Sequence, residues 1–140
     1  MTRISFYISR NSGTNSRLSI LFRLVEKAYF KGHDILIASD NENEAKRIDT
    51  QLWSFKANRF IPHGFVGTRE GKIIGICCNQ EPDEHSGVLI NLQNTIPSFF
   101  SRFERLIEIV ESNDDDDLAR GRANWTYYKD RGYPLDKYEI

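Results

Sequence analysis

Hydrophobic and polar positions along the chain follow two rhythms. Arg3–Ser9 alternates apolar and polar residues, which predicts a β-strand. In Arg17–Lys31 apolar residues recur every three or four positions, which predicts a helix. Asp34–Ser39 is a nearly continuous apolar run, typical of a strand buried on both faces of a parallel sheet. A second helix is predicted from about Asn43 to Trp53. This strand–helix–strand–helix opening predicts a right-handed βαβ unit and an α/β layered fold.

The middle of the chain is more strand-like. Three short apolar segments are separated by turn-forming residues, namely Arg59–Val66, Lys72–Cys78 and Gly87–Leu92. A helical turn is predicted within Ile96–Phe103, and the alternation in Arg105–Glu111 favours a further strand. We therefore expect a mostly parallel central sheet flanked by helices, without internal repeats or a second domain.

The last predicted helix, Leu118–Tyr133, has an unusual stripe. At about 100° per residue one face holds a leucine, an indole and two cations, which are Leu118, Arg122, Trp125 and Lys129. The opposite face holds small residues suited to packing on the sheet, which are Ala119, Ala123 and Thr126. Two interpretations of the stripe stay open: a solvated rim, or a binding site for an acidic and apolar partner. The preceding run Asp114–Asp117 is interpreted as a solvated helix cap.

Composition limits the function classes. The 140 residues are 39% hydrophobic and 28% charged, which is typical of one globular domain spanning residues 1–140. The formal net charge of −1 argues against a protein coated with positive charge for wrapping nucleic acid. We find no signal peptide and no apolar stretch long enough to span a membrane, so we expect a cytoplasmic protein.

Signatures of catalysis are weak. Adjacent Cys77 and Cys78 are interpreted as reduced, largely buried thiols. The segment GTREGK at Gly67–Lys72 is one residue short of a Walker loop and precedes a strand, so a hairpin turn explains it better. The three histidines have no metal-ligand spacing. We therefore expect no catalytic residue, metal or cofactor.

Two aromatic residues are better explained by binding than by the core. Trp53 lies roughly 100° from the inner stripe of its helix, and Phe60 follows a polar segment. Both fit either a peripheral hydrophobic cluster or an exposed aromatic patch, and such patches are typical of protein interfaces.

Several segments of this sequence resemble one protein family. These include HDILIAS, RIDTQLWSFKANRFIPHG, VLINL and ARGRANWTYYKDRGYPL. The most specific elements contain Asp49, Leu52, Trp53, Phe60, Pro62 and His63, and then Arg122, Trp125, Tyr128, Arg131, Gly132 and Tyr133. Together they resemble the chi subunit of bacterial DNA polymerase III over essentially the whole chain.

The resemblance implies a Rossmann-like domain without catalytic function in the clamp-loader assembly. It implies two partners: the psi subunit, and the acidic C-terminal tail of the single-stranded-DNA-binding protein, which ends in phenylalanine. Carried over by position, the tail-binding residues are Val110, Arg122 and Trp125, flanked by Tyr128 and Lys129. The psi-binding residues are Trp53 and Phe60. The alternative is a nucleotide-binding protein or small-molecule enzyme of the same α/β class, and a third possibility is direct nucleic-acid binding by the stripe.

Overall fold

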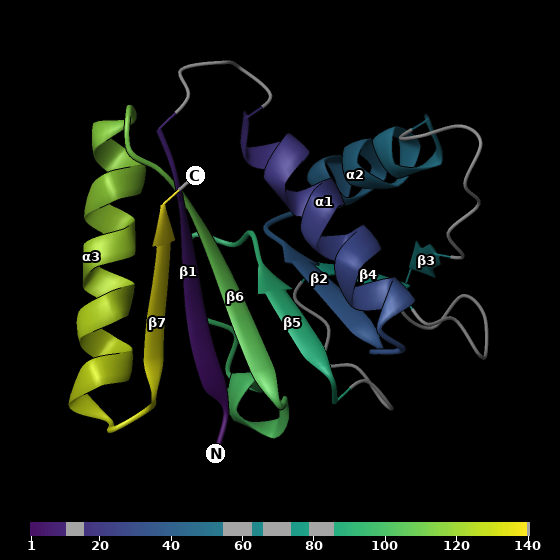
Figure 1. Cartoon of the computed structure of the whole chain (residues 1–140). Helices are drawn as coiled ribbons and strands as arrows, with labels where there is room; N and C mark the ends of the chain where they lie inside the picture. Colours follow the sequence, from purple (N-terminus) through teal and green to yellow (C-terminus); the bar gives the residue numbers. More distant parts are fainter. Residues whose placement is uncertain (11–15, 55–62, 66–73, 79–85, 140) are drawn as a thin grey trace.

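A single parallel sheet organises the molecule. The computed structural model describes residues 1–10, 16–54, 63–65, 74–78 and 86–139. These residues form a seven-stranded sheet in the order β3-β4-β2-β5-β6-β1-β7, in which every neighbouring pair is parallel (Figure 1). The strands are β1 (Arg3–Ser9), β2 (Ile35–Ser39), β3 (His63–Phe65), β4 (Ile74–Cys78), β5 (Val88–Asn91), β6 (Arg105–Glu111) and β7 (Leu135–Glu139). The helices are α1 (Ser16–Phe30), α2 (Glu42–Ser54) and α3 (Asp115–Asp130), with a short 3₁₀ helix, η1 (Phe100–Arg102). The prediction of an α/β layered fold with a mostly parallel sheet is confirmed.

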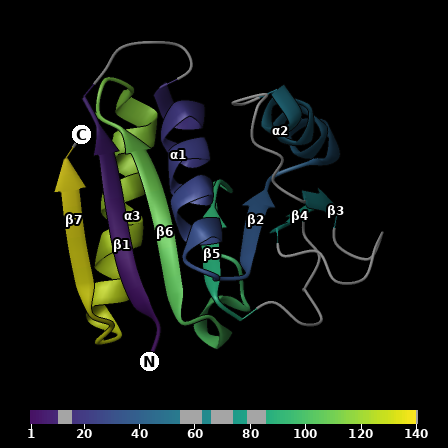
Figure 2. The same cartoon turned by 45° about the vertical axis from the view of Figure 1, so that its right-hand side comes forward.

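The helices divide between the two faces of the sheet. The inner stripes of α1 and α2 pack on one face, in a core that includes Leu21, Val25 and Ile48. On the other face α3 and η1 pack in a second core, which includes Phe100 and Tyr128. Figure 2 shows α3 behind the strands and α1 in front of them. The core is thus two apolar layers separated by the sheet, as expected when parallel strands are covered on both sides.

The helices that connect two pairs of parallel strands lie on opposite faces of the sheet. Helix α1 follows β1 and leads to β2, whereas α3 follows β6 and leads back to β7. Because β1 and β6 are adjacent, the direction of winding changes between them. Helix α3 packs mainly on β6 and lies beside β7 in Figure 1, where no described helix lies in front of β7.

The predicted strands and helices agree with these elements, with one strand omitted. The hairpin turn predicted at Gly67–Lys72 was wrong, because the strands on either side of it, β3 and β4, are parallel, whereas a hairpin joins antiparallel strands. The strands predicted at Arg3–Ser9 and Arg105–Glu111 have those bounds in the structure. The β7 strand was not predicted, and it pairs in parallel with β1 at the edge of the sheet. Its five residues are partly or largely exposed, so the hydrophobic alternation that reveals a buried strand is absent.

Several sequence motifs fall outside the described part of the chain. The segment Gly67–Lys72 lies entirely outside it, and Arg59–Val66 lies there in large part. Neither cysteine forms a disulfide within the described part of the chain, and Cys77 is buried while Cys78 is partly exposed. Among the described helices, none combines the length and the apolar character needed to span a lipid bilayer.

Candidate functional site

Helix α3 begins at a well-formed N-cap. The Asp114 side chain accepts hydrogen bonds from the backbone N–H groups of Asp116 (3.0 Å) and Asp117 (3.2 Å). Carboxylates at this end of a helix are favourable because they satisfy unpaired N–H groups and oppose the helix dipole. The acidic run therefore fixes where α3 starts, and three of its aspartates form the first turn of the helix.

The face that α3 turns to the sheet differs from the predicted one. Its buried residues are Gly121, Asn124 and Tyr128. The predicted inward residues Ala119, Ala123 and Thr126 are exposed, so that prediction was wrong. It assumed that the inner face would be small and apolar, whereas two of the three inward residues are polar and find partners within the core.

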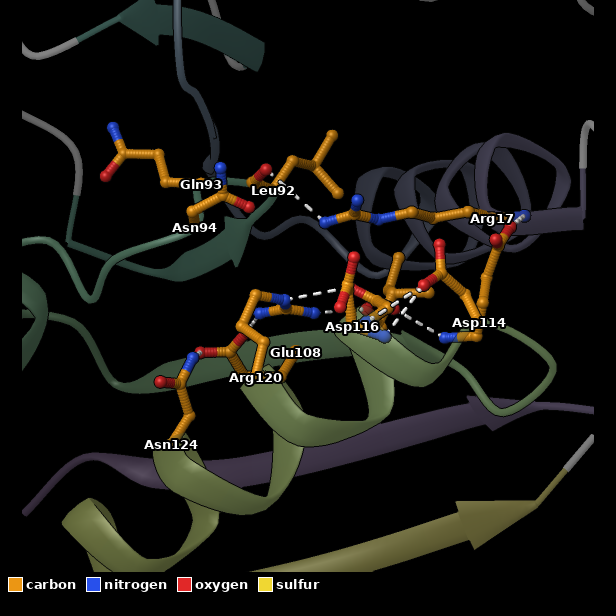
Figure 3. A network of polar contacts seen from close by, with 12 residues as sticks. Arg17, Leu92, Gln93, Asn94, Glu108, Asp114, Asp116, Arg120 and Asn124 are labelled. Atoms are coloured by element: carbon orange, nitrogen blue, oxygen red, sulfur yellow. Dashed lines mark hydrogen bonds and ion pairs between the residues drawn. The ribbon is translucent and has the colours of Figure 1, made fainter.

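Those partners surround Glu108, a fully buried carboxylate in the middle of β6. Its Oε1 accepts a hydrogen bond from Arg120 Nη1 at 3.0 Å (Figure 3). Its Oε2 accepts three more, from Asn91 Nδ2 (3.1 Å), Asn124 Nδ2 (3.2 Å) and Tyr128 Oη (2.8 Å). A buried charge is tolerated only when it is paired and hydrogen-bonded, and Glu108 meets both conditions.

Arg120 is the counter-charge of this network and joins it to the start of the helix. Its Nε lies 2.9 Å from Asp117 Oδ1, and its Nη2 donates to the carbonyl of Ile109 at 3.0 Å. Burial by itself lowers the pKa of Arg120, but the charges of Glu108 and Asp117 outweigh this effect and leave that pKa raised. Burial, followed by the charge of Glu108, raises the pKa of Tyr128 far above its ordinary value. Tyr128 is therefore a neutral donor throughout the physiological range.

Beside this network a cavity of about 690 Å³ opens between α3 and the edge of the sheet. Its apolar walls come from β1, β6 and α3, and consist of Phe6, Ile8, Val110, Leu118 and Trp125. The Trp125 ring meets Phe6 edge to face, with centroids 5.2 Å apart. The indole is thus held against the core while part of it remains exposed at the cavity.

The rim of the cavity is polar and carries positive charge. Two exposed cations, Arg122 and Lys137, line it together with one exposed carboxylate, Glu139, so the rim has an excess of one positive charge. Lys137 lies 3.6 Å from Glu139, which also pairs with Arg10. The Arg122 guanidinium has no hydrogen-bond or ion-pair partner among the described residues. The cavity therefore joins an apolar interior to an available fork of N–H donors, a combination suited to a carboxylate on an apolar group.

The structure brings together three of the five residues assigned to tail binding. Val110, Arg122 and Trp125 all line the cavity. Tyr128 does not, because it is fully buried against Glu108. Lys129 is exposed but also lies outside the lining, about 10 Å along the helix from Arg122 at 1.5 Å per residue.

Sequence reasoning missed two walls of the cavity. Phe6 and Ile8 were placed on a strand, and their alternation already put them on one face of β1. Lys137 was missed because β7 itself was not predicted. Of the two psi-assigned residues, Trp53 belongs to α2 and Phe60 lies outside the described residues.

The acidic run is not part of the cavity lining. None of the four residues Asp114–Asp117 lines it. Asp114 is occupied as the N-cap, and Asp117 accepts from the Glu111 N–H at 2.7 Å and from Arg120. In the described part of the chain, no group of three or more potential metal ligands is close enough to hold an ion.

Comparisons with known proteins agree on one family. Residues 1–136 match the family model described as "DNA polymerase III chi subunit, HolC". A Pseudomonas aeruginosa protein named DNA polymerase III subunit chi is 30% identical over 140 residues, covering 100% of this chain and 98% of the relative. Escherichia coli and Haemophilus influenzae proteins of the same name are 29% and 31% identical, covering 97% and 78% of this chain and the same shares of the relatives.

Proposed function

Because this chain belongs to the family of DNA polymerase III chi subunits, we propose that it is a non-catalytic adaptor of the replication machinery. It binds the acidic C-terminal tail of the single-stranded-DNA-binding protein in the cavity between α3 and the sheet. A second surface binds the psi subunit of the clamp loader. The adaptor thereby links the polymerase holoenzyme to protein-coated single strands in the cytoplasm.

The observation that supports tail binding is the pairing of an apolar cavity with the Arg122 guanidinium. The terminal phenylalanine ring of the tail fits against Val110 and Trp125, and its carboxylate accepts from Arg122. A charge-assisted hydrogen bond of this kind contributes about 1.5–3 kcal/mol. Micromolar binding needs about 8 kcal/mol in all, so burial of the ring supplies the rest.

Positive charge around the cavity suits the aspartates upstream in the tail. Lys137 lies at the rim, and Lys129 lies farther along the exposed side of α3. Lys129 is therefore a source of longer-range attraction, and Tyr128 acts indirectly by holding α3 on the sheet. Asp115 and Asp116 are exposed near the N-terminus of α3, about two helical turns from Arg122. At this distance salt partly screens the repulsion between these aspartates and the acidic tail.

For psi, the proposed surface includes Trp53 at the end of α2 and Phe60 in the following segment. Helix α2 lies on the face of the sheet opposite α3 and far from β7 in strand order. Helix α2 is thus separated by the sheet from the cavity proposed for the tail, as an adaptor that holds both partners at once requires.

The decisive experiment is a calorimetric titration of the full chain with a C-terminal peptide of its own host's single-stranded-DNA-binding protein. We expect micromolar binding that is lost when the terminal phenylalanine is removed. A peptide with the same aspartates but an amidated C-terminus controls for general charge attraction and should bind at least about tenfold more weakly. Equal affinity for the intact and shortened peptides would contradict the proposal.

A further inference from the structure

A second cavity, of about 540 Å³, lies on the face of the sheet opposite α3. Its walls come from β1, from the amino-terminal parts of β5 and β6, from β7, and from the end of α1 with the residues that follow it. Strand alternation separates the two cavities: Phe6 and Ile8 face α3, whereas Arg3 and Tyr7 face this side. Nothing in the proposed binding of the tail uses this cavity.

Positive charge is concentrated in the lining. Four side chains are cationic, namely Arg3, Lys27, Lys31 and Arg105, against the single carboxylate of Glu104. Arg3 is paired with Asp136 at 2.8 Å, which lies outside the lining. In a chain with a formal net charge of −1, this is a local excess of cations.

Three of these cations have no carboxylate partner among the described residues. Arg105 donates through Nε and Nη2 to the hydroxyl of Ser5, at 3.1 and 3.0 Å, and this neutral partner leaves its charge uncompensated. Lys27 and Lys31 make no side-chain hydrogen bond or ion pair with the described part of the chain. Lys27 lies in the last turn of α1 and Lys31 directly after its end, where the Lys31 N–H donates to the Lys27 carbonyl at 3.2 Å, so the two lysines form a row beside the sheet.

Aromatic rings lie next to this positive charge. Tyr7 on β1 and Tyr138 on β7 stack with centroids 5.0 Å apart and an angle of 23° between the rings. Tyr138 is 40% exposed, which is high for so large a side chain. No described helix lies in front of β7 in Figure 1, and the exposed part of Tyr138 leaves the ring pair accessible to a ligand.

We infer that this cavity and the adjoining face of β1 and β7 bind single-stranded nucleic acid, with phosphates on Lys27, Lys31 and Arg105 and a base stacked on the Tyr7–Tyr138 pair. Aromatic rings on an open sheet beside a row of cations suit a flexible polyanion that carries planar bases. An acidic peptide without aromatic residues would use the cations but not the rings. The relatives are named as DNA polymerase subunits, so single strands are at hand where this chain works.

The test measures binding of the full chain to short labelled oligothymidylate and oligouridylate by fluorescence anisotropy, with no other protein present. We expect weak binding that falls steeply as salt is raised, because phosphate contacts release counterions. Comparing the affinities for the two oligonucleotides shows whether the surface prefers DNA or RNA. A mononucleotide should compete poorly, because its one phosphate can contact only part of the surface formed by the three cations without a carboxylate partner.

Two variants separate charge from stacking. In the double variant Lys27→Ala and Lys31→Ala, the plot of log affinity against log salt should become less steep by about 1.4. Each phosphate contact with a single strand accounts for about 0.7 of this change. Tyr138→Leu should weaken binding about fivefold or more, while Tyr138→Phe should retain it. Thermal unfolding of each variant checks the fold, and the lysine variant tests the proposal even if Tyr138→Leu is destabilised.

Matched controls decide whether the effect is local. Arg23 and Lys46 are exposed cations outside both cavities, so Arg23→Ala with Lys46→Ala should leave affinity and slope unchanged. Arg122→Ala, on the opposite face, should also have no effect. The inference is overturned by undetectable binding at low salt, by an equal loss in either control, or by polyglutamate competing as well as the oligonucleotide.

Discussion

Val110 and Gly121 lie closer together than two residues with side chains could. A β-carbon placed on Gly121 would be 2.7 Å from Cγ2 of Val110, a separation that real side chains do not adopt. The glycine lets α3 approach β6 closely, and both residues line the cavity proposed for the tail. The shape of that cavity therefore depends on the absence of a single methyl group.

We predict that Gly121→Ala destabilises the protein by about 1–3 kcal/mol, because overpacking in a dense core forces the helix or Val110 to move. Adding Val110→Ala to this variant should recover part of that loss by removing the atoms that clash. Urea unfolding of the two single variants and the double variant measures the coupling. Strictly additive effects would show that the contact does not set the position of α3.

Arg120→Ala should lower the free energy of unfolding by about 3–5 kcal/mol, since it leaves the Glu108 carboxylate buried without its counter-charge. Chemical denaturation measures the loss. Adding Glu108→Gln to Arg120→Ala should restore part of the stability, because an amide needs no counter-charge and its oxygen can still accept hydrogen bonds. A loss below about 1 kcal/mol in the single variant would mean that water replaces the guanidinium.

Stability should fall as pH rises above about 10, the ordinary pKa of tyrosine. The folded state raises the pKa of Tyr128, mainly through burial. Above pH 10 the unfolded chain loses this proton and the folded chain keeps it, so each such tyrosine reduces stability by about 1.4 kcal/mol per pH unit. Burial also raises the pKa of Tyr7, which adds to the wild-type decline. Urea unfolding across this pH range should therefore show a shallower decline for Tyr128→Phe, and an unchanged slope would contradict the assignment.

Arg122→Ala should weaken tail-peptide binding about tenfold or more, consistent with the loss of one charged hydrogen bond, while leaving the thermal transition unchanged. Lys129→Ala is the matched control on the same exposed side of the helix. It should reduce affinity less, and its effect should disappear at high salt, because it acts only at longer range. Calorimetry with the same peptide measures both, and a larger effect at Lys129 would exclude Arg122 as the carboxylate partner.

Phe60→Ala should weaken pairing with psi, about tenfold if Phe60 is an interface anchor, and should leave tail-peptide affinity unchanged. Calorimetric titration of the variant with psi and, separately, with the tail peptide measures the two interactions. A parallel loss of both would mean either that the surfaces are not separate or that the domain has unfolded, and the thermal transition distinguishes these cases.

Most of the fold could be predicted because buried strands carry a clear apolar signal. The alternation around Phe6 identified β1, and the helical spacing around Val25 identified α1. The strand β7 lacked such a signal because an edge strand needs only partial burial, and its sequence LDKYE is mostly polar.

The orientation of α3 could not be read from its own sequence. Its inward face holds Asn124 and Tyr128 because β6 buries Glu108 opposite them, 16 and 20 positions earlier and on a different element. A glutamate inside the apolar run RLIEIVE was the available clue, since a buried carboxylate requires donors from another element. The cavity residues Val110, Arg122 and Trp125 were named from the family resemblance, whereas Phe6 and Lys137 required the packing of β1 and β7.

The alternation of side chains along β1 also limits how many residues can be inserted into this strand. Neighbouring residues of the strand line different cavities, Phe6 the one beside α3 and Tyr7 the one beside α1. Inserting one residue between Ile4 and Ser5 would turn one half of the strand over relative to the other, exchanging apolar and polar side chains between the two cavities. Inserting two residues would preserve the facing of every side chain. Any lengthening of β1 that keeps both surfaces must therefore come in even steps.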